Sequence, residues 1–178
     1  KLGEKGMNLI IEKQNRDGSW FYGGTKATRY IDNFHTGFML RAINQAITIY
    51  KSQKLEKALK LGMKFYYNSL FEKKTDTQIC PKHFLAKYIP LNSNIIQKTD
   101  IRDCALSIIL FSEMSDNNND YRNIALYILN WTNKYMTRRQ TYFVEKAWLW
   151  TNKIPYIDFQ AWMLLAHTKY LTSIISNE

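Results

Sequence analysis

Three similar phrases in the sequence place carboxylates beside groups that carry out acid–base chemistry. They are Tyr30-Ile31-Asp32-Asn33-Phe34, Asp100-Ile101-Arg102-Asp103-Cys104 and Tyr156-Ile157-Asp158-Phe159-Gln160. Carboxylate, imidazole and guanidinium groups that line one cavity can protonate a glycosidic oxygen, abstract a C5 proton or hold a sugar acid. We therefore predict catalytic roles for Asp32, His35 and Asp103, and substrate contacts for Arg102, Asp158 and Gln160.

Asp32 and His35 are three positions apart, so their side chains lie on one side of the chain if the segment is already helical at Asp32. A carboxylate beside an imidazole holds its tautomer and leaves the other ring nitrogen for proton transfer. The alternative is that Asp32 caps the helix and His35 bonds a neighbouring loop, which gives stability without chemistry. Capping is equally an alternative for Asp103 and Asp158, because acidic residues are favoured at helix N-termini.

The long loops add aromatic and charged side chains. Aromatic rings stack on sugar faces, and arginine holds carboxylates or phosphates, so this mixture suits a polar oligosaccharide cleft. We predict further substrate contacts from Trp20, Tyr22, Arg138, Glu145 and Trp148. The alternative is that these aromatic residues only seal one end of the fold.

Composition excludes several classes of protein. The 178 residues are 46% hydrophobic and 22% charged, which is typical of one globular domain. No apolar run is long enough to span a membrane. Cys80 and Cys104 form no metal-binding motif, so we expect no metal and no cofactor, and free cysteines favour a cytoplasmic location.

The net charge of +10 could attract a polyanion. However, one group of lysines recurs every three or four residues, as on the solvated face of a helix. The group is Lys51, Lys54, Lys57, Lys60 and Lys64. Arginine is scarce, and we expect no nucleic-acid partner.

The apolar spacing predicts helices over about residues 2–14, 36–51, 54–70, 102–114, 120–136 and 158–175, with Thr36 as a candidate cap. Long connections cover 16–35, 71–100 and 137–157, and each ends in one of the three phrases. This repetition predicts stacked helical hairpins. We expect a single all-α domain over 1–178, an α/α toroid of about three hairpins.

The segment from Lys5 to Trp20 holds a longer motif whose matching positions are Lys5, Gly6, Gln14, Gly18 and Trp20. It resembles the QW motif of terpenoid cyclases and protein prenyltransferases, although Leu9 stands where that family prefers an aromatic residue. In that family the glutamine ties a helix end and the tryptophan packs on the neighbouring repeat. The resemblance therefore implies an α/α toroid, whose closed form has six hairpins.

The catalytic patterns of that family are missing: no D-x-D-D and no D-x-C occur. The segment from Tyr30 to Phe38 is similar instead to phrases in toroid proteins of polysaccharide metabolism. We expect a polysaccharide-modifying domain, of hydrolase, lyase or epimerase type, that takes an oligosaccharide. The alternatives are a non-catalytic glycan-binding or assembly module, and an isoprenoid domain acting on another small molecule.

Half a ring would leave apolar surface on its inner helices. We therefore expect either a missing N-terminal part, which makes this chain the C-terminal portion of a longer one, or self-association.

Overall fold

The computed structural model describes residues 2–85, 98–147 and 149–175, and Trp148 therefore lies outside the described residues. The helices are α1 Leu2–Lys13, α2 Asn33–Tyr50, α3 Gln53–Leu70, α4 Ile101–Glu113, α5 Asn119–Tyr135 and α6 Ile157–Ile175, with short 3-10 turns at Lys26–Thr28 and Ser115–Asn117. The strands are β1 Phe71–Thr75, β2 Gln78–Pro81, β3 Lys98–Asp100, β4 Thr137–Arg138, β5 Thr141–Tyr142, β6 Glu145–Ala147 and β7 Thr151–Asn152.

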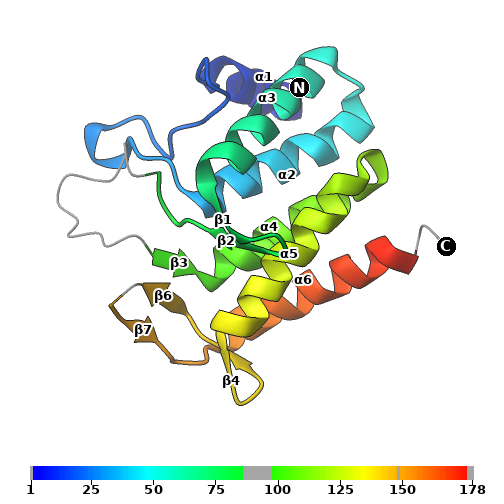
Figure 1. The fold of residues 1–178 in the computed structure, drawn as a ribbon. Coiled ribbons are helices and arrows are strands. Elements are labelled where there is room, and N and C mark those ends of the chain that lie inside the picture. Colours follow the sequence, from blue (N-terminus) through cyan, green and yellow to red (C-terminus); the bar gives the residue numbers. More distant parts are fainter. Residues whose placement is uncertain (1, 86–97, 148, 176–178) are drawn as a thin grey trace.

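The described helices stack as hairpins, as the sequence predicts (Figure 1). Helices α2, α4 and α6 form an inner row, in which α4 packs between the other two. Helix α3 covers α2, α5 covers α4, and α1 packs on α3. The lysine face of α3 is exposed, as expected for a solvated outer helix.

Helix α4 is the centre of the core. Its sequence, IRDCALSIILFSE, is apolar on almost every side, and its residues from Asp103 to Phe111 are all fully buried. A helix that is apolar all round requires neighbours on all sides, and α2, α5 and α6 supply them. Helix α6, at the edge of the row, instead exposes a stripe of large apolar side chains: Ile157, Leu164, Leu171 and Ile175.

A charged cluster joins the inner helices away from their first turns. Arg41 of α2 donates from Nε and Nη2 to the two carboxylate oxygens of Glu113 in α4, at 2.7 and 2.8 Å. Lys169 of α6 lies 3.1 Å from the same carboxylate. The bidentate geometry makes the Arg41–Glu113 contact the better-defined part of this cluster.

Helix α2 begins three residues earlier than the apolar pattern predicts. Its N-cap is Asp32, whose carboxylate accepts the backbone N–H of His35 at 2.7 Å. Thr36 was therefore wrongly predicted as the cap: it lies inside the first turn and donates its hydroxyl to the Asp32 carbonyl at 2.6 Å. A carboxylate also suits the positive end of the helix dipole.

Short strands organise the long loops, and the sequence analysis did not predict them. The strands pair as β1–β2, β3–β6–β7 and β4–β5, all antiparallel. They gather at the end of the fold where α4 and α6 begin (Figure 1). Strand β3 runs directly into α4, so its pairing with β6 fixes the first turn of that helix.

Gln14 and Trp20 brace the end of α1. The Gln14 amide donates to the carbonyls of Gly18 and Ala58, at 3.1 and 2.9 Å, and thereby ties the turn to α3. The Trp20 indole donates to the Ile10 carbonyl at 2.8 Å and is almost fully buried. Gly18 has φ +96° and passes against the Leu61 backbone, where a side chain would clash. Gln14, Gly18 and Trp20 therefore have a structural role at the end of α1.

Candidate functional site

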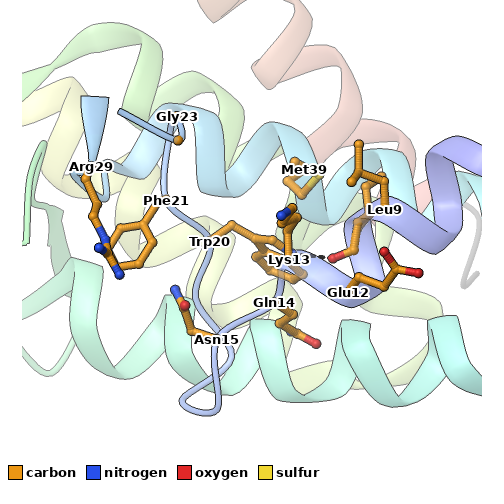
Figure 2. A pocket seen from close by; sticks show the side chains of 12 residues that line it. Leu9, Glu12, Lys13, Gln14, Asn15, Trp20, Phe21, Gly23, Arg29 and Met39 are labelled. Carbon is orange, nitrogen blue, oxygen red and sulfur yellow. Dashed lines mark hydrogen bonds between the residues drawn. The ribbon is translucent and has the colours of Figure 1, made fainter. Parts of the chain in front are cut away.

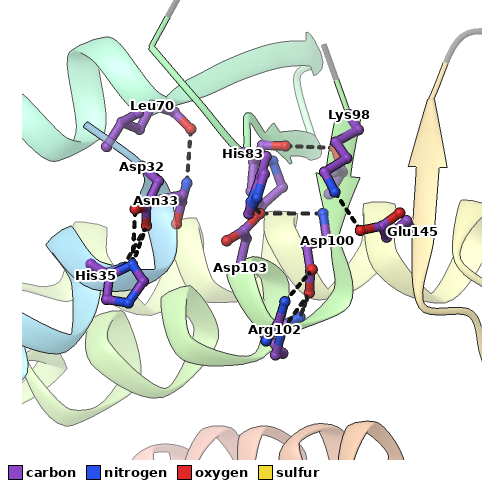
Figure 3. Close-up of polar contacts among 12 residues, drawn as sticks. Asp32, Asn33, His35, Leu70, His83, Lys98, Asp100, Arg102, Asp103 and Glu145 are labelled. Carbon is purple, nitrogen blue, oxygen red and sulfur yellow. Dashed lines mark hydrogen bonds and ion pairs between the residues drawn. The ribbon is translucent and has the colours of Figure 1, made fainter. Parts of the chain in front are cut away.

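Asp32 and His35 form a carboxylate–imidazole pair at the start of α2. The Nδ1 atom of His35 lies 3.0 and 2.8 Å from the two carboxylate oxygens of Asp32. The Asp32 side chain is 3% exposed, whereas the His35 side chain is 49% exposed. One carboxylate thus both caps the helix and orients the ring, and Nε2 has no hydrogen-bond partner within the described ranges (Figure 3).

A second pair, between His83 and Asp103, was missed by the sequence analysis. His83 Nδ1 lies 2.8 Å from Asp103 Oδ2, which also accepts the backbone N–H of Asp100 at 3.2 Å. Asp103 is fully buried, and its Oδ1 has no partner among the residues that the structure describes. Burial raises the pKa of Asp103 to about 6, against the opposing charge of His83. Burial lowers the pKa of His83, but attraction to Asp103 outweighs it, so the net change is upward.

The segment around His83 connects the two pairs. The His83 carbonyl accepts the backbone N–H of Asn33 at 2.9 Å, and Leu85 N–H donates to Ile31 at 3.1 Å. The Asn33 side chain donates to Leu70 at 3.0 Å and accepts the hydroxyl of Tyr66 at 2.6 Å. This bonding holds the first turn of α2 against the segments that carry Leu70 and His83 (Figure 3).

Aromatic rings surround the exposed imidazole. Tyr22 stacks on Tyr30 with 4.9 Å between ring centroids, and its ring also meets His35 edge-on at 4.4 Å. Phe34 contacts His35 from another side at 5.5 Å. Tyr22 is exposed, so this cluster offers a ring surface beside the histidine.

The row of contacts continues across the first turns of the inner helices. The Arg102 guanidinium of α4 lies over the rings of Phe34 and Phe159, at 5.6 and 5.3 Å from their centroids. Phe34 also meets Trp162 of α6 edge-on at 5.8 Å. The starts of α2, α4 and α6 therefore share one aromatic and cationic surface.

One cavity adjoins the Asp32–His35 pair, and a second, larger cavity adjoins the first. The smaller, about 140 Å³, is lined by Tyr22, Asp32, His35 and Phe38, among others. The larger, about 650 Å³, shares Trp20, Phe21 and Met39 with it. Figure 2 shows Arg29 against Phe21 at one end of the larger cavity, where the guanidinium lies 4.8 Å from the ring centroid.

The remaining predicted residues are dispersed. Trp20 lines both cavities, but its indole nitrogen is used within the fold. Arg102 is engaged by Asp100, and Glu145 pairs with Lys98. The side-chain amide of Gln160 accepts the Tyr142 N–H through its oxygen and donates from its nitrogen to the Tyr142 carbonyl. Arg138 and Asp158 are exposed, in β4 and in the first turn of α6.

The structure thus brings Tyr22, Asp32 and His35 to one cavity, and Asp103 is buried apart from its lining. Among the described residues, no cluster of three or more His, Cys, Asp or Glu side chains is arranged to hold a metal ion. No described helix meets the length and hydropathy needed to cross a membrane.

No protein-family model and no curated protein matches the sequence. Solved structures do match. A GH76 α-mannanase from Bacteroides thetaiotaomicron has a TM-score of 0.71 at 11% identity, covering 96% of this chain and 52% of the mannanase. The cellobiose 2-epimerase of Spirochaeta thermophila has a TM-score of 0.71 at 12% identity, with 94% and 45% covered. A sugar epimerase from a ruminal bacterium has a TM-score of 0.73 at 11% identity, with 94% and 46% covered.

The chain therefore spans about half the length of the solved structures that it matches. At these identities the likeness shows the fold alone. The comparisons do not support the resemblance to terpenoid cyclases and prenyltransferases. The chain has the fold of a partial α/α toroid, which it shares with carbohydrate-active enzymes.

Proposed function

We propose that this chain is a carbohydrate-active domain that transfers a proton to or from a sugar, with His35 as the proton-transfer group. The observation that supports this role is the Asp32–His35 pair, in which the buried carboxylate holds Nδ1 and the half-exposed ring presents Nε2 beside a cavity. A general base needs this combination of fixed orientation and access.

Proton abstraction fits this site better than hydrolysis. Glycoside hydrolysis by the usual mechanisms uses a pair of carboxylates that flank the glycosidic bond. Here Asp32 is held by its histidine and Asp103 is buried with His83. The accessible group is an imidazole, which suits an epimerase or lyase.

The substrate class that we propose is an acidic oligosaccharide. His35 would take the C5 proton of a uronic acid unit, because the adjacent carboxylate acidifies that carbon–hydrogen bond. Return of a proton to the opposite face gives epimerisation, and loss of the C4 oxygen substituent gives elimination. Arg29, which is exposed at the neighbouring cavity, is suited to hold the sugar carboxylate, and Tyr22 to stack on the ring.

The test is proton exchange in D₂O. Oligomers of galacturonate, glucuronate and mannuronate are incubated with the protein, and NMR follows deuterium at C5 while absorbance follows the unsaturated product of elimination. We expect exchange by the wild type and a loss of about 100-fold or more in His35→Ala, the usual contribution of a general base. Unchanged exchange in His35→Ala would contradict the assignment.

A non-catalytic glycan-binding module is the second candidate, and the exposed Tyr22–Tyr30 stack favours it. It predicts that the same oligosaccharides bind without exchange or cleavage. Binding that is lost in Tyr22→Ala and kept in His35→Ala would favour this candidate.

We also propose that a second half ring completes the site, because this chain covers about half of each ring structure that it matches. The exposed stripe of α6 would lie in that contact. Sedimentation velocity tests whether the second half is another copy of this chain: a dimer supports a second copy, and a monomer contradicts it.

A further inference from the structure

A separate cavity lies between the β1–β2 hairpin, β3, β6 and the end of α5, and we call it the outer pocket. Its volume is about 570 Å³, and it shares no lining residue with the cavity beside Asp32 and His35 or with the larger cavity that adjoins it. Its polar and aromatic lining includes Lys74, Lys82, Lys98, Trp131, Tyr135 and Lys146.

The lysines give the outer pocket an excess of positive charge. Lys74 pairs with Glu72 at 2.6 Å, and Lys98 pairs with Glu145. Lys82 and Lys146 have no carboxylate partner in the part of the chain that the structure describes. Lys82 and Lys146 are both partly buried residues that line this cavity, so their positive charges attract an anion to it.

The aromatic wall comes from one turn of α5. The rings of Trp131 and Tyr135 lie 5.6 Å apart between centroids, and Lys134 lies 5.1 Å from the centre of the Tyr135 ring. Trp131 is almost fully buried, so it is held in place, whereas Tyr135 is 37% exposed. Aromatic walls of this kind receive the apolar face of a sugar ring.

Hydrogen bonds hold the walls of the outer pocket together. The Thr99 hydroxyl of β3 donates to the Pro81 carbonyl of β2 at 2.6 Å. The Asn130 amide of α5 donates at 3.3 Å to the carbonyl of Thr77, in the turn between β1 and β2. The strands and α5 are thereby joined without a ligand, so binding there needs little rearrangement.

We propose that the outer pocket binds an acidic sugar, with its carboxylate or other oxyanion at Lys82 and Lys146 and its ring against Tyr135. The inference is independent of the chemistry at His35. It assigns the protein a second place to hold an acidic glycan, outside the cavity where the reaction occurs.

The experiment is a titration of the protein at low ionic strength by calorimetry and by NMR. The probes are trigalacturonate, inorganic phosphate and the neutral trisaccharide maltotriose. The main variant is Lys82→Glu with Lys146→Glu. The matched control is Lys57→Glu with Lys60→Glu, which makes the same change in net charge on the exposed face of α3. If the melting temperature of the main variant falls, a milder pair, Lys82→Gln with Lys146→Gln, replaces it.

We expect trigalacturonate to bind the wild type and His35→Ala alike. The main variant should lose at least tenfold in affinity, and the control should stay within twofold. Tyr135→Ala should weaken the binding of trigalacturonate and leave the affinity for phosphate unchanged.

Four results would overturn the proposal. An equal loss in the control would indicate general attraction by the net charge. If neutral maltotriose binds as tightly as trigalacturonate, the lysines do not contribute to recognition of the sugar. Phosphate binding as tightly as trigalacturonate would indicate an oxyanion site without sugar recognition. Loss of binding in His35→Ala alone would place the acidic sugar in the cavity beside α2 instead.

Discussion

Two carboxylate–imidazole pairs in this molecule have almost the same short contact and very different surroundings. His35 and Asp32 meet at 2.8 Å, and the His35 ring is half exposed. His83 and Asp103 also meet at 2.8 Å, but the Asp103 carboxylate is fully buried. The first begins α2, at the side of the inner row. The second begins α4, which is covered on all sides.

The difference shows that burial, more than contact geometry, decides what such a pair does. A buried pair has lost its hydration and depends on each partner to compensate the other. An exposed imidazole keeps its hydration and can exchange protons with a ligand. This contrast supports a structural role for the His83–Asp103 pair and the proton transfer that we propose for the Asp32–His35 pair.

The largest effect should come from breaking the buried pair. Asp103→Ala leaves His83 without its partner, and we expect the free energy of unfolding to fall by about 3 kcal/mol. Urea denaturation measures it. In the same assay His35→Ala should cost less than about 1 kcal/mol, because the ring is half exposed. Equal losses would refute the division between the two pairs.

The buried pair should also make stability depend on pH. Asp103 has a pKa of about 6 in the folded protein against an ordinary 3.8, and the pKa of His83 is raised above 6.5. Both groups bind a proton more tightly when folded. Their contribution to stability is therefore present at low pH and is lost as pH rises, through Asp103 between 3.8 and about 6 and through His83 above 6.5.

We expect the wild type to lose about 2 kcal/mol more than Asp103→Asn between pH 4 and pH 7, measured by urea denaturation at each pH. Glu113 and His167 have lowered pKa values and act in the opposite direction, but both remain in the variant. The difference between the two proteins thus isolates the pair. If the free energy of unfolding changes with pH in the same way in both proteins, Asp103 does not titrate between pH 4 and pH 7.

A smaller effect should follow from the hydroxyl that connects the two helix starts. Tyr66 Oη donates to Asn33 at 2.6 Å and lies 2.8 Å from Ser107. Tyr66→Phe should cost about 1 kcal/mol, the value of one buried hydrogen bond. The exposed neighbour Tyr67 provides the control, since Tyr67→Phe should leave the melting temperature unchanged. If Tyr66→Phe stays folded but exchanges protons with the sugar more slowly, Asn33 also positions Asp32.

The smallest effect should come from the charged cluster. Arg41→Ala removes a bidentate but partly exposed contact to Glu113, so we expect a loss of about 0.5–1 kcal/mol. Thermal melts at low and high salt test whether this loss of stability is electrostatic. The gap between wild type and variant should narrow in high salt, and a gap that does not change would point to lost packing.

Much of the fold could be predicted from the sequence because the helices are long and strongly periodic. The expected helices agree with the observed ones to within three residues at each end. The strands could not be predicted, because they have two to five residues and lack alternation; β1 reads FEKKT and has one buried residue. Strand β3 pairs with β6, which comes from a distant loop, so no local pattern marks that pair.

The candidate site was predictable only where it is local. Asp32 and His35 share one helical turn, so their spacing alone indicated the contact. His83 and Asp103 are twenty residues apart and meet because β3 returns the chain to α4. Gln160, a predicted substrate contact, bonds the β5 backbone, and no spacing rule predicts that contact.

The Arg41–Glu113–Lys169 cluster has a mechanical consequence. It ties three consecutive inner helices together away from the end where their first turns present the aromatic surface. The two oxygens of the Glu113 carboxylate contact both neighbours, Arg41 in α2 and Lys169 in α6. One side chain at the end of α4 therefore couples the spacing of the three inner helices.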